Sequence, residues 1–254
     1  MDLTYEGAFA WGLIAASSLV IGAVIAFLID IPTRIVGLIM GFGAGVLISA
    51  VAFDLIEEAV GESVGRGFIA AGLFLGCLVF YGGDRLIDSL GKSQGEDPTG
   101  AGGKEAGGGG GGSSLSIVLG SVLDGIPESV VIGLTIFKGG AVGFAYLAAV
   151  FISNLPESIS ASAGLVSGGW KKSKVLWMWI GIALVSAVAS LLGYTLFQGA
   201  SPDVLAFVLA FAGGAILTML ADTMMPEAFE HGGKVVGVAV TLGFAVAFTI
   251  HLLG

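Results

Sequence analysis

One short stretch of the chain, SVLDGIPESVVIGL (121–134), holds two carboxylates and a proline within an otherwise apolar run. Asp124 and Glu128 are four residues apart, so a helix would place them one turn apart on the same face. A carboxylate in hydrocarbon is costly, and such acids usually face the interior of a helical bundle and pair with another group. The stretch therefore predicts a polar site inside an apolar helix.

A second stretch repeats this arrangement. The segment SNLPES (153–158) matches GIPES (125–129) in its Pro-Glu-Ser order, and Ser153 and Glu157 again lie four residues apart. Asn154 precedes Glu157 by three residues, which places its amide beside the same face. If the two faces meet, carboxylates, an amide and a hydroxyl gather at one place, and neither stretch contains a Lys or Arg to pair with them. The missing partner is then a proton or a cation.

Each stretch also carries a proline next to its glutamate. Pro127 removes the helix hydrogen bond to the carbonyl of Leu123, and Pro156 removes the bond to the carbonyl of Ile152. Inside a membrane, a freed carbonyl has to be satisfied by a neighbouring group, by water or by an ion. A single proline of this kind is usually a plain kink, but two matched Pro-Glu pairs favour a shared site.

The composition indicates which elements position these residues. Of 254 residues, 56% are hydrophobic and only 11% are charged, and the mean hydropathy is +1.00. A soluble domain carries about a quarter charged residues. We therefore expect an all-α integral membrane protein that forms a single transmembrane domain over 1–254. Its apolar runs are long enough to cross a bilayer and cover residues 8–29, 35–58, 67–89, 114–137, 142–166, 174–198, 203–225 and 235–253, which predicts eight transmembrane helices.

The basic residues predict the orientation of these helices, because Lys and Arg are enriched on the cytoplasmic side. With the N-terminus outside, the cytoplasmic side receives Arg34, Arg85, Lys92, Lys104, Lys171, Lys172, Lys174 and Lys234, and the outside receives only Arg66 and Lys138. We expect a multi-pass protein of the cell membrane, plasma or inner, with both termini extracytoplasmic. The Gly-rich residues 91–114 are expected to form a flexible cytoplasmic loop.

An internal repeat relates the second and seventh apolar runs. Residues 41–59 align without gaps on residues 210–228, with matching Phe, Gly and Glu-Ala positions. With eight spans, the two copies cross the membrane in opposite directions. Inverted repeats of this kind build the two related halves of many transporters around a midplane site. We therefore predict a 3+2+3 arrangement in which the fourth and fifth helices are the central pair.

At these residues the chain resembles the ZIP (ZRT/IRT-like) family of divalent metal transporters. The family pattern is His-Asn-x-Pro-Glu in the fourth helix and a similar His-x-x-Pro-Glu in the fifth, and the family's seventh helix ends much like MMPEAFEHG (224–232). The resemblance covers the whole chain and implies a secondary transporter that moves metal into the cytoplasm by alternating access. Asp124 and Ser153 stand where the family has histidine. The metal-site positions that the resemblance implies are Asp124, Glu128, Ser153, Asn154 and Glu157.

The two replaced histidines leave a site made of oxygen atoms only. Imidazole suits zinc, copper, iron and nickel, whereas carboxylate and carbonyl oxygens suit manganese and other harder ions. The predicted cargo is a divalent transition metal ion, with zinc, manganese, iron and cadmium as the candidates, carried as substrate and with no cofactor. Because metal binding displaces protons from carboxylates, transport should depend on pH.

Further ionisable residues mark the two ends of the predicted path. Asp54 and Glu58 lie toward the outer end of the second span, where negative charge would attract cations. Asp222, Glu227 and His231 lie toward the inner end of the seventh span and could collect ions on release, because a neutral imidazole can bind metal. The competing interpretation is that acids at helix ends are simply solvated.

Two other classes of protein remain open at this stage. The same carboxylates could serve a proton or organic-cation carrier. An intramembrane hydrolase would need two aspartates in contact, but Asp54, Asp124 and Asp222 are predicted at different depths, so we do not expect an enzyme. His251 is expected at the membrane interface rather than as a metal ligand. The expected partners are divalent metal ions and the lipid bilayer, with no nucleic acid, and a homodimer is left open.

Overall fold

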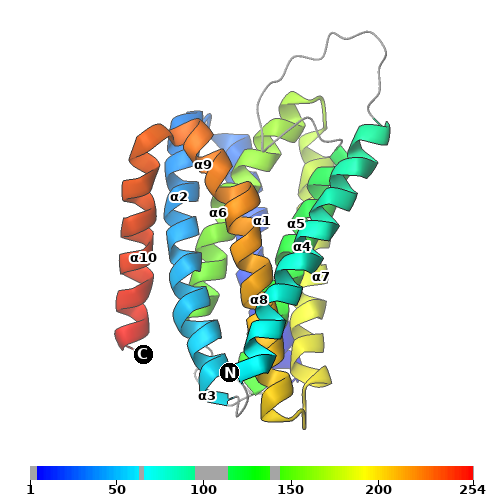
Figure 1. The fold of residues 1–254 in the computed structure, drawn as a ribbon. Helices are drawn as coiled ribbons and strands as arrows, with labels where there is room; N and C mark the ends of the chain where they lie inside the picture. Colours follow the sequence, from blue (N-terminus) through cyan, green and yellow to red (C-terminus); the bar gives the residue numbers. More distant parts are fainter. Residues whose placement is uncertain (1–4, 63–65, 95–113, 138–143, 254) are drawn as a thin grey trace.

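A computed structural model describes residues 5–62, 66–94, 114–137 and 144–253, and within these ranges the chain is almost entirely helical, without a β-strand. Figure 1 shows a bundle of long helices in which α1 begins and α10 ends at the same end. The expected all-α class is confirmed. The α-helices are α1 (Tyr5–Leu28), α2 (Thr33–Ala50), α3 (Glu57–Glu62), α4 (Arg66–Gln94), α5 (Ser114–Phe137), α6 (Phe144–Ser167), α7 (Lys172–Leu196), α8 (Pro202–Met219), α9 (Met225–Gly232) and α10 (Val236–Leu253).

Six segments of the described chain are long and apolar enough to cross a membrane, namely Tyr5–Leu28, Thr33–Glu62, Gly67–Ile87, Val118–Ile136, Lys172–Leu196 and Pro202–Leu253. These segments make the protein a multi-pass membrane protein. The last segment has 52 residues and folds back near Gly233, so α8 with α9 and α10 form separate rods (Figure 1). Gly233 has a φ of 68°, which glycine adopts without a steric penalty. α6 is not among the six, because polar residues such as Asn154 and Glu157 lower its hydropathy. The count of eight spans stays a prediction.

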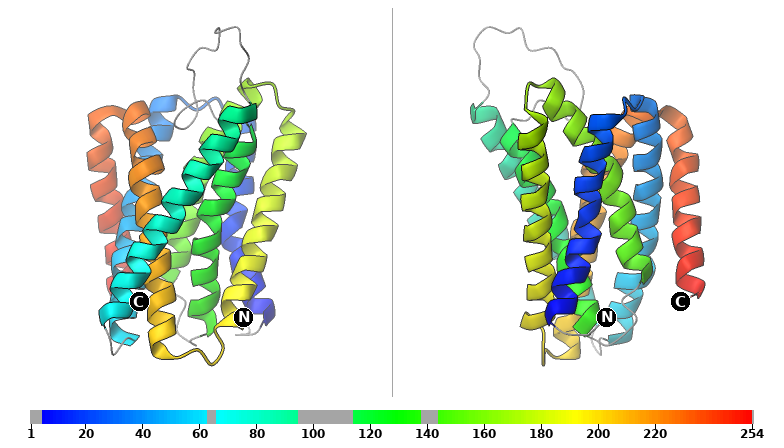
Figure 2. Two further views of the ribbon diagram at one scale, coloured as in Figure 1. Left: turned by 45° about the vertical axis from the view of Figure 1, so that its right-hand side comes forward. Right: turned by 180° about the vertical axis from the view of Figure 1, so that it is seen from behind.

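The long helices pack in two sets that meet at the centre of the bundle. α1 packs along both α6 and α7, and α5 packs along α7. In the other set, α2 packs along α10, and α4 packs along α8. The two sets join where α2 lies against α6, as the two views in Figure 2 also show. This packing places α5 and α6, which carry the polar stretches, among the other helices.

The contact between α2 and α10 depends on glycine. A Cβ added at Gly45 would overlap the backbone carbonyl oxygen of Val240, and a Cβ at Gly243 would overlap that of Phe42. Small residues of this kind let two helix backbones approach closely in a membrane. Any side chain at either position would push α2 and α10 apart.

The contact between α4 and α8 is built in the same way. A Cβ at Gly214 would overlap the carbonyl oxygen of Leu73, and a Cβ at Gly76 would overlap that of Phe211. In the alignment of 41–59 on 210–228, Gly214 is the counterpart of Gly45 and Phe211 is the counterpart of Phe42. The residues that the repeat aligns therefore make matching close contacts with two different helices.

Both aligned helices change from α-helix to π-helix. α2 continues as the π turn η1 (Val51–Ile56) before α3, and α8 continues as the π turn η2 (Leu220–Met224) before α9. In each copy, the amide of the first π residue is shared between the carbonyls three and four residues before it. Val51 and Leu220 are aligned partners, so the two π turns begin at equivalent positions.

The boundaries of the predicted Gly-rich loop differ from the structure at its first residues. α4 continues to Gln94, so residues 91–94 extend the helix rather than begin the loop. This polar helical end has no apolar signal and was therefore assigned to the loop. Residues 95–113, which contain the glycine run, lie outside the described residues.

Candidate functional site

The two Pro-Glu stretches lie within continuous helices. Pro127 is inside α5 and Pro156 is inside α6, and both helices continue through their proline. Ser153 and Asn154 are buried at 2% and 7% exposure. The hydroxyl of Ser153 donates a hydrogen bond to the carbonyl oxygen of Val150 at 3.0 Å, so its oxygen keeps free lone pairs. The helices thus present polar groups to the interior of the bundle.

The carboxylates of the two helices gather in one region. Both Glu157 and Glu128 lie close enough to Asp124 to repel its charge. The charge of Glu157 also acts on Glu128, which is 2% exposed. In the part of the chain that the structure describes, no three His, Cys, Asp or Glu side chains are arranged to hold a metal ion. The acids of α5 and α6 therefore lie in one region, but in this conformation they do not form a ready-made metal coordination site.

Two further residues join this region that the sequence did not single out. Ser121 of α5 is buried and donates a hydrogen bond to the carboxylate of Glu157 on α6, which ties the two helices together. Asp84 of α4 lies within electrostatic range of Asp124. Ser121 was detectable in principle, because it precedes Asp124 by three residues on the same helix face. The proximity of Asp84 depends on how α4 packs against α5, which no local pattern encodes.

At one end of the bundle, the predicted exit residues lie next to α6. The hydroxyl of Ser160 donates a 2.6 Å hydrogen bond to Oε1 of Glu227, and the charge of Glu227 acts on Glu157. His231, one turn beyond Glu227, has a buried Nδ1 without a hydrogen-bond partner among the described residues. Asp222, by contrast, lies exposed in η2 and does not line this region.

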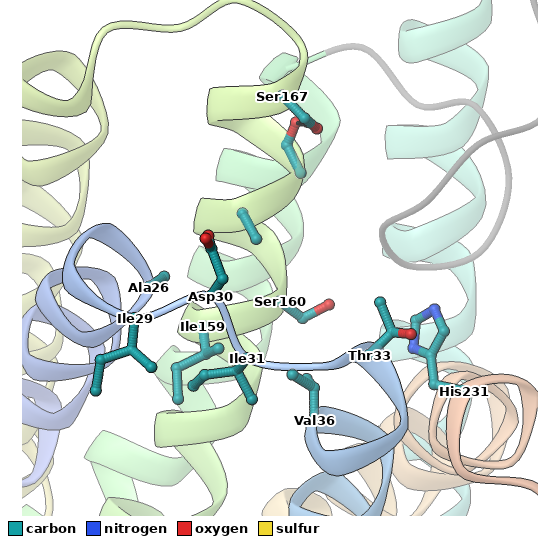
Figure 3. A pocket seen from close by; sticks show the side chains of 12 residues that line it. Ala26, Ile29, Asp30, Ile31, Thr33, Val36, Ile159, Ser160, Ser167 and His231 are labelled. Carbon is teal, nitrogen blue, oxygen red and sulfur yellow. Dashed lines mark hydrogen bonds between the residues drawn. The ribbon is translucent and has the colours of Figure 1, made fainter.

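A cavity opens beside these residues. It has a volume of about 260 Å³ and lies between the α1–α2 connection, α6 and His231. Figure 3 shows Ser160, Thr33 and His231 on one side of it and Asp30 on another. An imidazole, a carboxylate and hydroxyls lie among the otherwise mostly apolar side chains that line the cavity.

At the opposite end, Asp54 of η1 meets the last helix. Nδ1 of His251 lies 2.9 Å from Oδ1 of Asp54, and the His251 ring lies 5.4 Å from the ring of Phe53. Glu58 lies within electrostatic range of Asp54 and so belongs to the same cluster. The ring of His251 thus pairs with a half-buried carboxylate 197 residues away in sequence, a contact that the expected interfacial position did not include.

Comparison with known proteins gives relatives at low identity. No protein-family model matches the chain. A putative zinc transporter of Arabidopsis thaliana is 25% identical over 227 residues, which cover 88% of this chain and 34% of that protein. The zinc transporter ZTP29 of the same plant is 26% identical over 264 residues, covering 96% of this chain and 93% of that protein. The zinc transporter ZupT of Escherichia coli O7:K1 is 25% identical over 227 residues, covering 86% and 85%.

The coverage differs among these relatives. The chain spans about a third of the length of the first Arabidopsis protein and most of the length of the other two. All three relatives are named transporters, and none is named an enzyme.

Proposed function

We propose that the chain is a ZIP-like secondary transporter that moves a divalent transition metal ion into the cytoplasm by alternating access. The observation that carries this proposal is the convergence of Asp124, Glu128 and Glu157 from α5 and α6, with no Lys or Arg on either helix. Buried acids without a basic partner need a cation or protons to offset their charge. The three relatives named as zinc transporters favour a metal ion as that cation.

The proposed architecture is an inverted repeat of eight spans, with α5 and α6 as the central pair. Three observations support it. The aligned residues Gly45 and Gly214 make matching close contacts, and the π turns η1 and η2 begin at aligned residues. The helix pairs also correspond, because α2 packs on α10 as α8 packs on α4, and α1 packs on α6 as α7 packs on α5.

The proposed orientation places both termini outside the cytoplasm. The ends of α1 and α10 lie together at one end of the bundle (Figure 1). The α6–α7 turn with Lys171, Lys172 and Lys174 lies toward the other end, where Lys172 donates a 2.8 Å hydrogen bond to the carbonyl oxygen of Phe27. A basic cluster at one membrane face favours the cytoplasmic side for that face.

In this orientation the ion passes through three groups of side chains. Asp54 and Glu58 attract it at the outer end, and Asp124, Glu128 and Glu157 bind it together with the oxygens of Ser153 and Asn154. Glu227 takes it over at the inner end, because the charge of this residue already acts on Glu157. The cavity next to His231 then leads it to the cytoplasm. Asp222 has a smaller part in this path, because its side chain is exposed away from the cavity.

The chemistry of the donors bears on which metal is carried. The central residues supply oxygen atoms only, which suit manganese as well as zinc, iron and cadmium. Oxygen ligands discriminate weakly among these ions, so we propose a carrier with a broader selectivity than an imidazole site would give.

A second candidate is a proton or organic-cation carrier that uses the same carboxylates. It is favoured by the finding that no three metal-binding side chains surround one point in the described chain. A proton relay needs acids within reach of one another but not a coordination shell. Metal analysis of the purified protein separates the two candidates, because only the metal transporter retains a stoichiometric divalent ion.

Uptake into proteoliposomes tests the proposed function. Purified protein is reconstituted, and uptake of Mn²⁺, Zn²⁺, Fe²⁺ and Cd²⁺ is measured for the native chain, for Glu128→Gln and for Glu157→Gln. Glu6→Gln is the matched control, because Glu6 is exposed at the start of α1. We expect uptake by the native chain and the control and strongly reduced uptake by both central variants. Equal uptake in all four proteins would exclude the proposed site.

A further inference from the structure

The two π turns lie at the same point of the aligned helices and nowhere else in the described chain. η1 begins at Val51 and η2 at Leu220, and the alignment pairs these residues. Each turn closes with an amide that bonds the carbonyl five residues before it, from Glu57 to Ala52 and from Met225 to Leu220. A π turn is uncommon, and single π turns within α-helices are frequent at functional sites. Two π turns that begin at aligned residues therefore favour a shared functional role.

A π turn holds one residue more than the α-helix that it interrupts. If such a turn closes to α-helical bonding in place, the segment beyond it rotates by about 100° and advances by about 1.5 Å, which is one residue of α-helix. A regular α-helix has no spare residue and cannot rotate in this way without breaking. The turn is therefore a joint about which one helix end can turn while the other end stays packed.

The acids at the ends of the path lie within η1 and in the segment beyond η2. α9 carries Glu227, whose carboxylate accepts the 2.6 Å hydrogen bond from Ser160 of α6. A rotation of about 100° would move Glu227 away from Ser160 and from Glu157. On the other side, η1 itself carries Asp54, which is held by His251 of α10. Each joint therefore has a polar contact that holds it in the present conformation.

The residues within the turns allow such a change. Ala52 and Ala221 are aligned partners, one in each turn, and both are exposed. A rotation at these two positions themselves buries or exposes only a methyl group, whereas the buried Leu55 and Met224 of the same turns have to repack. The flanking α2 and α8 are held by the close glycine contacts with α10 and α4. Beyond η2, α9 packs on α2, where a Cβ on Gly37 would lie 2.6 Å from the amide nitrogen of Gly232, so this is the contact that a rotation of α9 has to exchange.

We propose that η1 and η2 are matched joints that open and close the two ends of the path by exchanging π-helical for α-helical bonding. The inner joint controls whether Glu227 faces Ser160 and the central site, and the outer joint controls whether Asp54 faces His251. This proposal rests on the proposed transport function and names the two points in the chain where alternating access takes place.

Removal of the spare residue tests the joints. Deletion of Ala52 from η1, or of Ala221 from η2, lets that turn adopt α-helical bonding. The helical segments before and after the turn then keep their present orientations relative to one another. We expect each deletion to leave Mn²⁺ binding to the purified protein within about twofold of the native value and to lower Mn²⁺ uptake at least about tenfold. A purely structural role for the turns would change binding and uptake together.

A rescue variant serves as the matched control. Deletion of Ala221 with an alanine inserted between Asp222 and Thr223 restores the number of residues in η2, and uptake should return to within about threefold of native. Native uptake in the deletion variants would overturn the proposal, and so would a rescue variant that stays inactive while binding Mn²⁺.

Amide hydrogen exchange on the native chain provides a second measurement if the deletion variants do not fold. Addition of Mn²⁺ should change the exchange of η1 and η2 more than that of the α-helical turns before them, and unchanged exchange at both turns would overturn the proposal. A native chain that takes up no metal ion contradicts the transport function, whereas uptake that survives the deletions contradicts only the joints.

Discussion

α5 and α6 carry the same Pro-Glu-Ser sequence but place it in different surroundings. On α5, Glu128 is 2% exposed, and the hydroxyl of Tyr146 lies 3.5 Å from its backbone carbonyl oxygen. On α6, Glu157 is half-buried, accepts a hydrogen bond from Ser121 and lies within electrostatic range of Glu227. Glu128 is enclosed by the bundle, whereas Glu157 is less completely buried and lies within electrostatic range of the acid at the inner end.

The difference in burial suggests that Glu128 and Glu157 have different roles in the proposed transporter. An enclosed carboxylate loses most of its hydration and so depends on the ion to offset its charge. A less completely buried carboxylate keeps more of its hydration, and Glu157 also lies near Glu227, a second acid that can receive the ion. We therefore assign tight binding to Glu128 and transfer toward the inner end to Glu157, and the following changes test this contrast.

The largest expected effect comes from neutralising the two glutamates separately. Glu128→Gln should lower the affinity for Mn²⁺ about a hundredfold, and Glu157→Gln about tenfold, because loss of an enclosed charged ligand costs more than loss of a partly hydrated one. Isothermal titration of the purified variants measures both affinities. Equal losses in the two variants would remove the contrast between α5 and α6.

Histidine substitutions at the two positions where the family pattern has histidine should have different effects on α5 and on α6. Asp124 is half-buried, so Asp124→His should fold and shift selectivity toward Zn²⁺ over Mn²⁺ by about tenfold. Ser153 is buried, and a Cβ on Gly43 of α2 would lie 3.2 Å from the Cα of Ser153, so Ser153→His should destabilise the packing of α2 on α6. Competition uptake and thermal unfolding are the measurements. A zinc preference that Asp124→His leaves unchanged would argue against a metal ligand at this position.

A smaller effect is expected from Ser121 of α5 and Ser160 of α6, whose hydroxyls donate hydrogen bonds to Glu157 and Glu227. Ser121→Ala removes the hydrogen bond to Glu157, and Ser160→Ala removes the bond to Glu227. Each should change the uptake rate by about three- to tenfold, because a typical intramolecular hydrogen bond contributes about 0.5–1.5 kcal/mol net. Ser17→Ala is the control, since the hydroxyl of Ser17 bonds only within its own helix, to the carbonyl of Ile14. A control that changes uptake as much as either variant would refute the assignment.

The smallest effect should come from Tyr146→Phe, which removes an α6 hydroxyl that lies near Glu128 of α5. The hydroxyl lies 3.5 Å from the carbonyl oxygen of Glu128, which is at the long limit for a hydrogen bond. Its loss should lower stability by less than about 1 kcal/mol and leave uptake nearly unchanged. Denaturant or thermal unfolding measures the first quantity. A large fall in uptake would mean that Tyr146 takes part in ion binding, and it would contradict the assignment of tight binding to Glu128 alone.

The sequence predicted the helices well because each is a long apolar run. The predicted run 114–137 coincides with α5, and the other runs differ from their helices by a few residues. Residues 91–94 were assigned to the loop because a polar helix end resembles a linker. The π turns could not be predicted, because α- and π-helical bonding place similar demands on side chains.

The proximity of the central acids could be predicted from spacing along each helix, whereas contacts that depend on packing could not, and the binding of a metal ion by these acids stays a prediction. Asp124, Glu128 and Glu157 came from matched local patterns, and the structure gathers them in one region. The pairing of Asp54 with His251 joins residues far apart in sequence, so it required the fold. Asp222 was expected on the inner path because its depth suggested it, but its place within η2 leaves it exposed.

X-ray absorption spectroscopy on the purified protein loaded with Zn²⁺ tests the central claim most directly. The chain contains two histidines, His231 and His251, and both lie outside the central pair. If the ion binds between α5 and α6, its first shell contains oxygen only, and the Glu128→Gln, Glu157→Gln double variant binds no Zn²⁺. A shell that contains imidazole nitrogen, or unchanged binding in the double variant, would contradict the proposed site.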